Sequence, residues 1–113
     1  MKKLTMALCG ALLSLNAMAG GNATNGEALT KKYNCAACHG ADFNSPIDPS
    51  YPKLAGQHEN YLEHALVAYK RGDGPNGRSN PIMGGQVKPL SHQDMKDIAA
   101  YLHGLKGSLV LKR

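Results

Sequence analysis

The sequence has 113 residues, a formal net charge of +5 at pH 7, one Phe and no Trp. Its charges are scattered instead of gathered in a block, and aromatic residues make up only 5% of the chain, so a nucleic-acid-binding role has little support. A chain of this length makes one small domain whose apolar core is marginal by itself. We therefore expect a disulfide, a metal or a prosthetic group to help hold it together.

Residues 1–19 are predicted to be a secretory signal peptide that is removed. The segment begins with Lys2 and Lys3, continues as a mostly apolar stretch and ends in an Ala-x-Ala cleavage site at Ala19. The alternative, an uncleaved membrane anchor, is disfavoured because the apolar stretch is short for a bilayer. Cleavage would leave residues 20–113 as one domain, with a net charge of +3 after loss of the two lysines. The expected location is the periplasm.

A first helix is predicted from Thr24 to about Cys35. Thr24 and Glu27 fit a capping box, in which each side chain bonds to the backbone amide of the other residue. The apolar face of this helix consists of Ala28, Leu29 and Tyr33. A later segment, residues 40–56, contains three prolines among small polar residues and is expected to be an irregular loop.

Two further helices are predicted after this loop. One begins near His58 and ends at Arg71, where Gly72 is a natural stop, and the last begins at Ser91 with Asp94 in the capping position. The apolar faces of these two helices are Tyr61, Leu62, Ala65, Leu66 and Tyr69 in the first, and Met95, Ile98, Ala99, Leu102 and Leu105 in the second. Residues 72–89, which lie between the helices and are rich in Gly and Pro, are expected to be loop.

The expected fold class is all-α, with three to four helices and long loops, because no alternating stretch is long enough for a strand. Two loops of this length are unusual in so small a domain. A large prosthetic group at the centre would explain them, since the loops could then pack on that group.

The strongest motif is Cys35-Ala36-Ala37-Cys38-His39, which matches the C-x-x-C-H signal for haem attachment. The two thiols add to the two vinyl groups of haem, and the following His presents its imidazole to the iron. We therefore predict one haem c, covalently attached through Cys35 and Cys38. Three alternatives are a thioredoxin-like redox pair, which needs a βαβ setting, a simple disulfide, and a zinc site that would also need two of the five histidines.

The chain resembles the class I cytochromes c, and in particular one half of the bacterial dihaem cytochromes c. The resemblance covers residues 26–105 and implies a haem between helices, with the first and last helices crossing beside it. It also implies that Gly26 on the first helix meets Tyr101 on the last. Four motifs carry it: Cys35 to Gly40, Tyr51-Pro52-Lys53-Leu54-Ala55-Gly56, Asn80-Pro81-Ile82-Met83 and Asp97-Ile98-Ala99-Ala100-Tyr101-Leu102.

Met83 is the predicted second axial ligand of the iron, opposite His39. A thioether favours ferrous iron and suits an electron carrier. Met83 lies in a predicted loop that can bend onto the haem, and the family has its ligand there, whereas Met95 lies on a helix face where core packing is expected. His92, His58 and an open site are the alternatives.

The resemblance further implies that the carbonyl of Pro52 accepts a hydrogen bond from Nδ1 of His39, which would orient the ring. Tyr69, Arg71 and Arg78 are candidates for contact with the haem propionates, with surface or packing roles as the alternative. The remaining histidines are expected to face solvent: His58, His64, His92 and His103.

These residues predict a periplasmic one-electron carrier, and not an enzyme. It would pass electrons between respiratory dehydrogenase or quinol-oxidising complexes and a terminal oxidase or reductase. The expected partners are redox proteins, namely membrane-bound respiratory complexes. No small-molecule substrate is expected, and the protein is expected to be a monomer. The alternatives are a haem subunit of a larger oxidoreductase and a haem enzyme or gas-binding protein with an open distal site.

Overall fold

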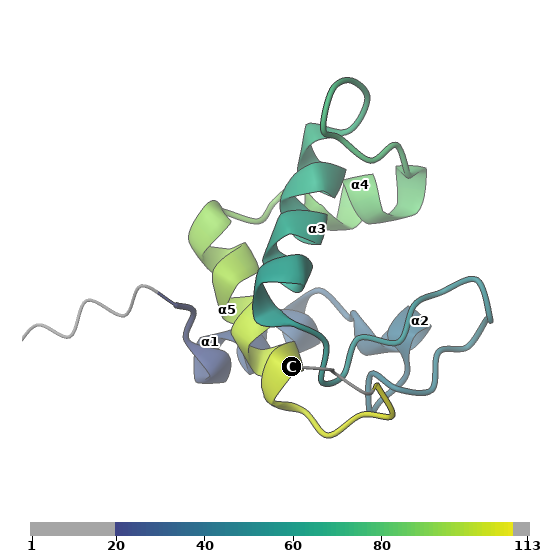
Figure 1. The fold of residues 1–113 in the computed structure, drawn as a ribbon, viewed down its shortest axis with the longest axis vertical. Coiled ribbons are helices and arrows are strands. Elements are labelled where there is room, and N and C mark those ends of the chain that lie inside the picture. The colour runs from purple at the N-terminus through teal and green to yellow at the C-terminus, as the bar shows by residue number, and fades with distance from the viewer. Residues whose placement is uncertain (1–19, 110–113) are drawn as a thin grey trace, which may run out of the picture.

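The structure, a computed structural model, describes residues 20–109, which form five helices and no strand (Figure 1). The all-α prediction is therefore confirmed. The predicted signal peptide, residues 1–19, lies outside the described part of the chain, as do residues 110–113. In the described part, no helix is both long and apolar enough to cross a membrane. The helices are α1 (Ala23–Lys32), α2 (Ala36–His39), α3 (Glu59–Arg71), α4 (Pro81–Val87) and α5 (His92–Gly104).

The first helix begins earlier than predicted and has a different cap. Asn22 is the N-cap residue, and its side-chain oxygen accepts a hydrogen bond from the backbone N–H of Asn25 at 3.0 Å. The predicted capping box of Thr24 and Glu27 is wrong. Thr24 lies inside the helix, and the Glu27 carboxylate instead pairs with Nζ of Lys31 at 3.0 Å, one turn further along.

A buried carboxylate on α5 selects this earlier start. Asp97 is 3% exposed. It accepts hydrogen bonds from the backbone N–H of Asn22 at 2.7 Å and from the side-chain amides of Asn25 and Gln93 at 2.6 and 2.9 Å. Burial alone raises the pKa of Asp97, but the three donors outweigh burial and hold this pKa below its usual value. The ionised carboxylate therefore ties the N-terminus of α1 to α5.

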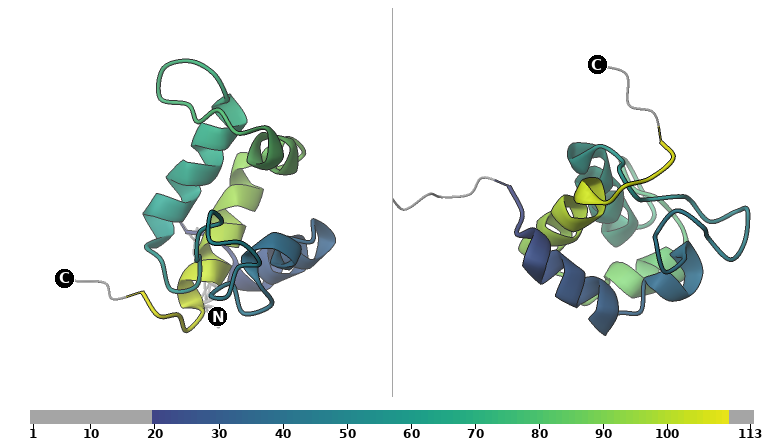
Figure 2. Two further views of the ribbon diagram at one scale, coloured as in Figure 1. Left: turned by 90° about the vertical axis from the view of Figure 1, so that its right-hand side faces the viewer. Right: turned by 90° about the horizontal axis from the view of Figure 1, so that it is seen from below.

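Gly26 lets α1 and α5 cross in direct contact. A Cβ atom on Gly26 would lie 1.9 Å from the carbonyl oxygen of Asp97 and 2.9 Å from Cβ of Tyr101, so only glycine fits. The ring of Tyr101 packs edge-on against Phe43, with the ring centres 6.2 Å apart. The expected meeting of Gly26 and Tyr101 is confirmed, and this pair of helices makes the most extensive helix–helix contact among the described residues (Figure 2).

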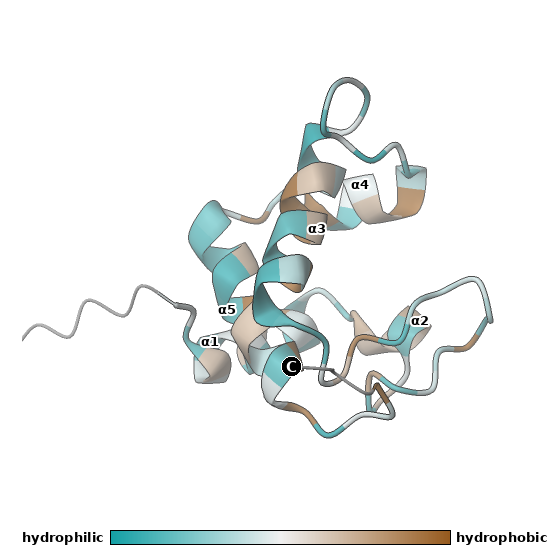
Figure 3. Ribbon diagram, viewed as in Figure 1, coloured by the Kyte–Doolittle hydropathy of each residue, from teal (hydrophilic) through white to brown (hydrophobic). Residues whose placement is uncertain are grey.

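The other two long helices lie where the sequence predicts them. Gly72 follows the last residue of α3 with φ of 67°, and Ser91 and Asp94 form the predicted capping box of α5. Both helices carry hydrophobic as well as hydrophilic residues along their length (Figure 3), as amphipathic helices do. The buried apolar core is small: Phe43, Ala55, Leu62, Val87, Leu90, Met95, Ile98, Ala99 and Leu102.

The long loop between α2 and α3 is closed through the backbone of Phe43. Its carbonyl oxygen accepts hydrogen bonds from the N–H groups of Leu54 at 2.8 Å and Ala55 at 3.0 Å, although Phe43 itself has a positive φ of 56°. Gly56 then donates to the carbonyl of Leu102 on α5 at 2.9 Å. The loop is thus closed on itself at Phe43 and attached to α5 at Gly56.

Replacing Gly26 with Ala is expected to lower the free energy of unfolding by about 2 kcal/mol, because the added methyl group forces α1 and α5 apart. Denaturant unfolding followed by circular dichroism measures this change. Gly104→Ala is the matched control, since a Cβ there meets nothing within 4 Å. Equal unfolding midpoints for the two variants would contradict the close crossing.

Replacing Asp97 with Asn is expected to cost about 1–3 kcal/mol at neutral pH, because charge-assisted hydrogen bonds are lost. A depressed native pKa stabilises the fold above the unfolded-state value of about 3.9, and this contribution disappears as pH falls through the native pKa. The difference in free energy of unfolding between Asp97→Asn and the wild type should therefore become smaller at acidic pH. Unfolding curves at about pH 7 and about pH 3 measure this change. Asp73→Asn, at an exposed position, is the control. A free-energy difference between Asp97→Asn and wild type that is the same at both pH values would refute the prediction.

Candidate functional site

A cavity of about 260 Å³ lies between the end of α1, α2, the loop of residues 50–57, α3, α4 and α5. All five residues that the sequence predicts for the site line it: Cys35, Cys38, His39, Pro52 and Met83. Most of the remaining wall is apolar, and its chief side chains are Leu54, Leu62, Ala65, Leu66, Ile82, Val87, Leu90, Ile98 and Leu102.

A tight turn between α1 and α2 delivers the first cysteine to this cavity. The helix ends at Lys32, before the predicted end at Cys35, because Asn34 takes a left-handed conformation with φ of 53°. The N–H of Cys35 still donates to the carbonyl of Thr30 at 3.0 Å, which anchors the turn to α1. Both the end of the helix and the start of the motif are therefore set by this one turn.

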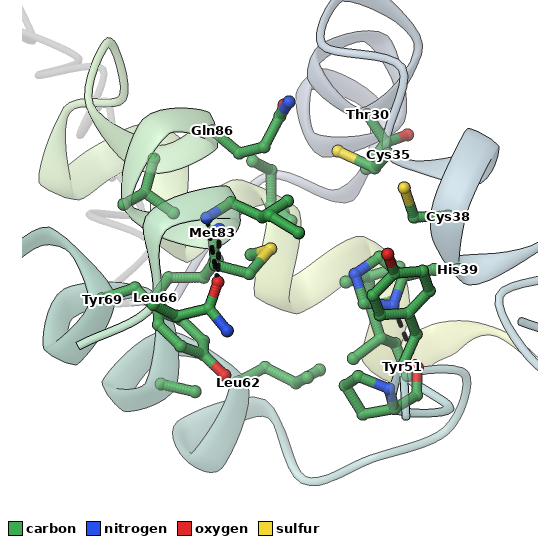
Figure 4. A pocket seen from close by; sticks show the side chains of 18 of the residues that line it. Thr30, Cys35, Cys38, His39, Tyr51, Leu62, Leu66, Tyr69, Met83 and Gln86 are labelled. Atoms are coloured by element: carbon green, nitrogen blue, oxygen red, sulfur yellow. Dashed lines mark hydrogen bonds between the residues drawn. The ribbon is translucent and has the colours of Figure 1, made fainter. Parts of the chain in front are cut away.

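The two thiols lie together at one end of the cavity (Figure 4). Cys35 and Cys38 are half-buried and free, and the N–H groups of Cys38 and His39 both donate to the Cys35 carbonyl, at 3.3 and 3.2 Å. Burial raises the pKa of the Cys35 thiol, and the neighbouring Cys38 raises it further. A reactive redox cysteine requires the opposite, a lowered pKa, so the thioredoxin-like alternative loses support.

His39 is the histidine that faces the cavity. It is 7% exposed, and its Nδ1 lies 2.9 Å from the carbonyl oxygen of Pro52. A carbonyl can only accept, so Nδ1 carries the proton and Nε2 keeps its lone pair. The hydrogen bond thus orients the ring so that one nitrogen is free to bind a metal.

The other histidines lie elsewhere, as expected. His58, His64, His92 and His103 are all exposed, and none lines the cavity. His92 pairs with Glu63. Within residues 20–109, no three side chains of His, Cys, Asp or Glu gather as they would around a metal ion. The donor cluster that a zinc site requires is therefore missing from the described part of the chain.

Met83 faces His39 from the opposite wall (Figure 4). It lies in α4, so the prediction of loop throughout residues 72–89 is wrong at this point. Asn80 is the N-cap, and its side-chain oxygen accepts hydrogen bonds from the N–H groups of Ile82 and Met83, each at 3.0 Å. Pro81 occupies the first turn, where its missing N–H costs nothing. The cap and the proline start a helix that the Gly84-Gly85 pair conceals in the sequence.

The second methionine of the described chain has a different role. Met95 is 3% exposed, belongs to the core and does not line the cavity, as predicted from its place on the apolar face of α5. His58 and His92, the alternative partners of His39, are also absent from the cavity wall. Among the described residues, Met83 is therefore the one soft donor opposite His39.

Most of the apolar face predicted for α3 lines the cavity. Only Leu62 is buried, whereas Ala65, Leu66 and Tyr69 are half-buried and line the cavity, and Tyr61 is 49% exposed at its edge.

The three candidates for contact with the haem propionates do not all lie in the cavity wall. Tyr69 and Arg78 line the cavity, whereas Arg71 lines only an adjacent shallow hollow beside α3, which Arg78 also borders. Among the polar residues of the cavity wall that were not predicted for the site are the buried Thr30 and the exposed Asn34, Ser50 and Gln86. Nothing in their local sequence distinguishes them from ordinary helix or loop residues.

Comparison with known proteins agrees with this geometry. The chain is 47% identical over 98 residues to cytochrome c4 of Stutzerimonas stutzeri, covering 82% of this chain and 45% of that protein. It is 39% identical over 106 residues to cytochrome c-553 of Helicobacter pylori, covering 94% of this chain and all of that protein. The crystal structure of reduced cytochrome c4 from Pseudomonas stutzeri superposes with a TM-score of 0.66 and 45% identity, over 79% of this chain and 48% of that one.

The chain thus spans about half the length of the cytochrome c4 relatives that it matches. The family model for cytochrome c matches residues 23–106, which include all five helices and the whole cavity wall. The match to a model over most of the chain and the fold point the same way: this protein belongs to the cytochrome c family of haem-carrying electron-transfer proteins.

Proposed function

We propose that this chain is a periplasmic one-electron carrier with a single haem c, attached through Cys35 and Cys38 and held between His39 and Met83. The observation that carries the proposal is that an imidazole and a thioether face each other across one cavity, beside two free thiols. A single haem is proposed because the C-x-x-C-H motif occurs once in the sequence.

The residues of the cavity fit haem c. The wall is mainly apolar, as a porphyrin ring requires, and the donors at its two sides are the nitrogen and soft sulfur that suit haem iron. The charged side chains in the wall are Lys53 and Arg78, both cationic, and no carboxylate lines the cavity. Apolar surface, donors and charge therefore all match a ring that carries two carboxylates.

Each of the chain's own groups has a separate task in this proposal. Cys35 and Cys38 each add their S–H across one vinyl C=C bond, so no atom is lost and no oxidant is needed. The Pro52 carbonyl keeps the proton of His39 on Nδ1, which makes Nε2 the nitrogen that binds and increases its donor strength. Asn80 caps α4 and so fixes the backbone from which Met83 reaches inward.

When bound, haem c supplies a one-electron couple between Fe(III) and Fe(II). Two protein ligands leave no open coordination position for a substrate, which favours a carrier over an enzyme or gas-binding protein. Met83 raises the reduction potential, because a thioether stabilises ferrous iron more than ferric iron. Leu62, Val87 and Leu102 are buried around the site and keep water from this side of it.

The proposal includes export and partners. Residues 1–19 would direct the chain to the periplasm and be removed after Ala19, as their charge, apolar stretch and cleavage site indicate. The partners would be membrane-bound respiratory complexes that donate or accept one electron, and the carrier would act as a monomer. The exposed Tyr61 and Ile82, 49% and 55% accessible at the cavity edge, offer apolar surface for such brief contacts.

Absorption spectra of protein from a haem-maturing, exporting host test the two axial ligands. The wild type should give a sharp reduced haem c spectrum that carbon monoxide leaves unchanged, and a weak near-infrared sulfur-to-iron band when oxidised. Met83→Ala should lose this band completely and respond to carbon monoxide, because one coordination position opens. Met95→Leu is the control and should keep both wild-type properties, since Met95 packs in the core.

A wild-type spectrum that shifts readily with carbon monoxide would refute the carrier and favour the enzyme or gas-binding alternative. Retention of the near-infrared band in Met83→Ala would refute the assignment of this ligand alone.

Extraction with acidified organic solvent tests the attachment. Haem should stay with the wild-type polypeptide, because two thioether bonds hold it. The double variant Cys35→Ala, Cys38→Ala should lose all of its haem to the solvent, and each single variant should keep haem through the remaining bond. Gel staining for haem peroxidase activity and mass spectrometry measure the outcome; complete extraction from the wild type would contradict covalent attachment.

A further inference from the structure

Arg78 is held at the cavity edge by two tyrosines of α3. Its guanidinium carbon lies 5.7 Å from the ring centre of Tyr61 and 5.4 Å from that of Tyr69, within the range of cation–π attraction. One guanidinium nitrogen also lies 3.4 Å from the Tyr61 hydroxyl, and the backbone N–H of Arg78 donates to the Ala68 carbonyl at 2.9 Å. Both the backbone and the side chain of this exposed residue are therefore positioned.

This arginine has no carboxylate partner within residues 20–109. Arginine carries its charge at every physiological pH, and its planar fork of N–H groups matches a carboxylate. No Asp or Glu lines the cavity beside it. The guanidinium is positioned at the edge of an apolar cavity and has no carboxylate of the protein to pair with. It can therefore pair with a carboxylate that belongs to the ligand.

The layout of the cavity indicates which part of the ligand carries the acid that Arg78 would meet. Cys35 and Cys38 lie at one end, and Tyr69 lies across the cavity from both (Figure 4). The vinyl groups and the two propionates of haem occupy opposite edges of the porphyrin. A ring attached through these thiols thus has its carboxylates toward the side of the cavity away from them.

We propose that Arg78, clamped by Tyr61 and Tyr69, pairs with a haem propionate and raises the reduction potential of this carrier. The inference rests on the proposed function, because it needs haem attached at Cys35 and Cys38. Arg78 acts here as a positioning and tuning residue, and it does not touch the iron. A fixed positive charge close to the haem favours the ferrous state, which carries one positive charge fewer.

The other nearby cations fit this role less well. Arg71 does not line the cavity; it lines a shallow hollow beside α3, whereas Arg78 lines both that hollow and the cavity. Lys53 lines the cavity, but a lysine presents a point charge on a flexible stem in place of a planar fork. The other titratable side chains of the wall are Tyr33, Cys35, Cys38, His39, Tyr51, Tyr61 and Tyr69.

The test is the reduction potential of the holoprotein, measured by spectroelectrochemical titration from about pH 4.5 to about pH 9, a range that spans carboxyl titration. In Arg78→Gln, the ratio of ferric to ferrous protein at a fixed applied potential should rise roughly three- to tenfold at high pH, as loss of one nearby charge predicts. A tenfold change equals about 59 mV for one electron.

The pH dependence gives a second readout that a purely structural role would not change. An adjacent cation lowers the pKa of a carboxyl group, so removing it should move the propionate inflection of the potential to higher pH. Arg78→Lys should show a smaller shift in the same direction. Arg71→Gln changes an exposed arginine that does not line the cavity, so it is the matched control and should behave as wild type.

Two results would overturn the inference. One is an Arg78→Gln protein with a normal haem c spectrum and both the potential and the inflection of wild type. The other is a Lys53→Gln variant that moves the inflection while Arg78→Gln does not. Failure of the proposed function looks different, because the wild type would then lack a haem c spectrum or bind carbon monoxide readily.

Discussion

The close crossing of α1 and α5 at Gly26 is the contact on which the rest of the structure depends. A side chain at this position would collide with the backbone of Asp97, so its absence lets the two helices touch. The Asp97 carboxylate then ties down the start of α1. Because the end of α1 leads straight into Cys35, the same contact determines where the C-x-x-C-H motif enters the cavity.

The domain is built around a space that its own side chains do not fill. The buried core consists mainly of residues from α4, α5 and the segments beside them, while most of the apolar face of α3 looks into the cavity. A porphyrin in that space would complete the core as well as supply the redox couple. Stability and function would then rest on the same apolar wall, which explains how so short a chain supports long loops.

The two proposed ligands are positioned by different kinds of contact. His39 is oriented by a carbonyl from the following loop, at Pro52, which the Phe43 backbone helps to close. Met83 is positioned locally, by the Asn80 cap three residues before it. The cationic edge of the cavity depends on a third arrangement, in which the segment after α3 turns back so that Arg78 meets Tyr61 and Tyr69.

Features that depend on short-range patterns can be predicted from the residues alone. The spacing of Cys35, Cys38 and His39 is set within one turn of chain, and the periodicity and caps of α3 and α5 are equally local. Other features depend on contacts between segments that are far apart in the chain. The start of α1 depends on Asp97, 75 residues from Asn22, and the choice of Arg78 over Arg71 depends on which side of α3 the returning segment takes. Both are long-range contacts, and neither leaves a periodic or spacing signal in the residues that make them.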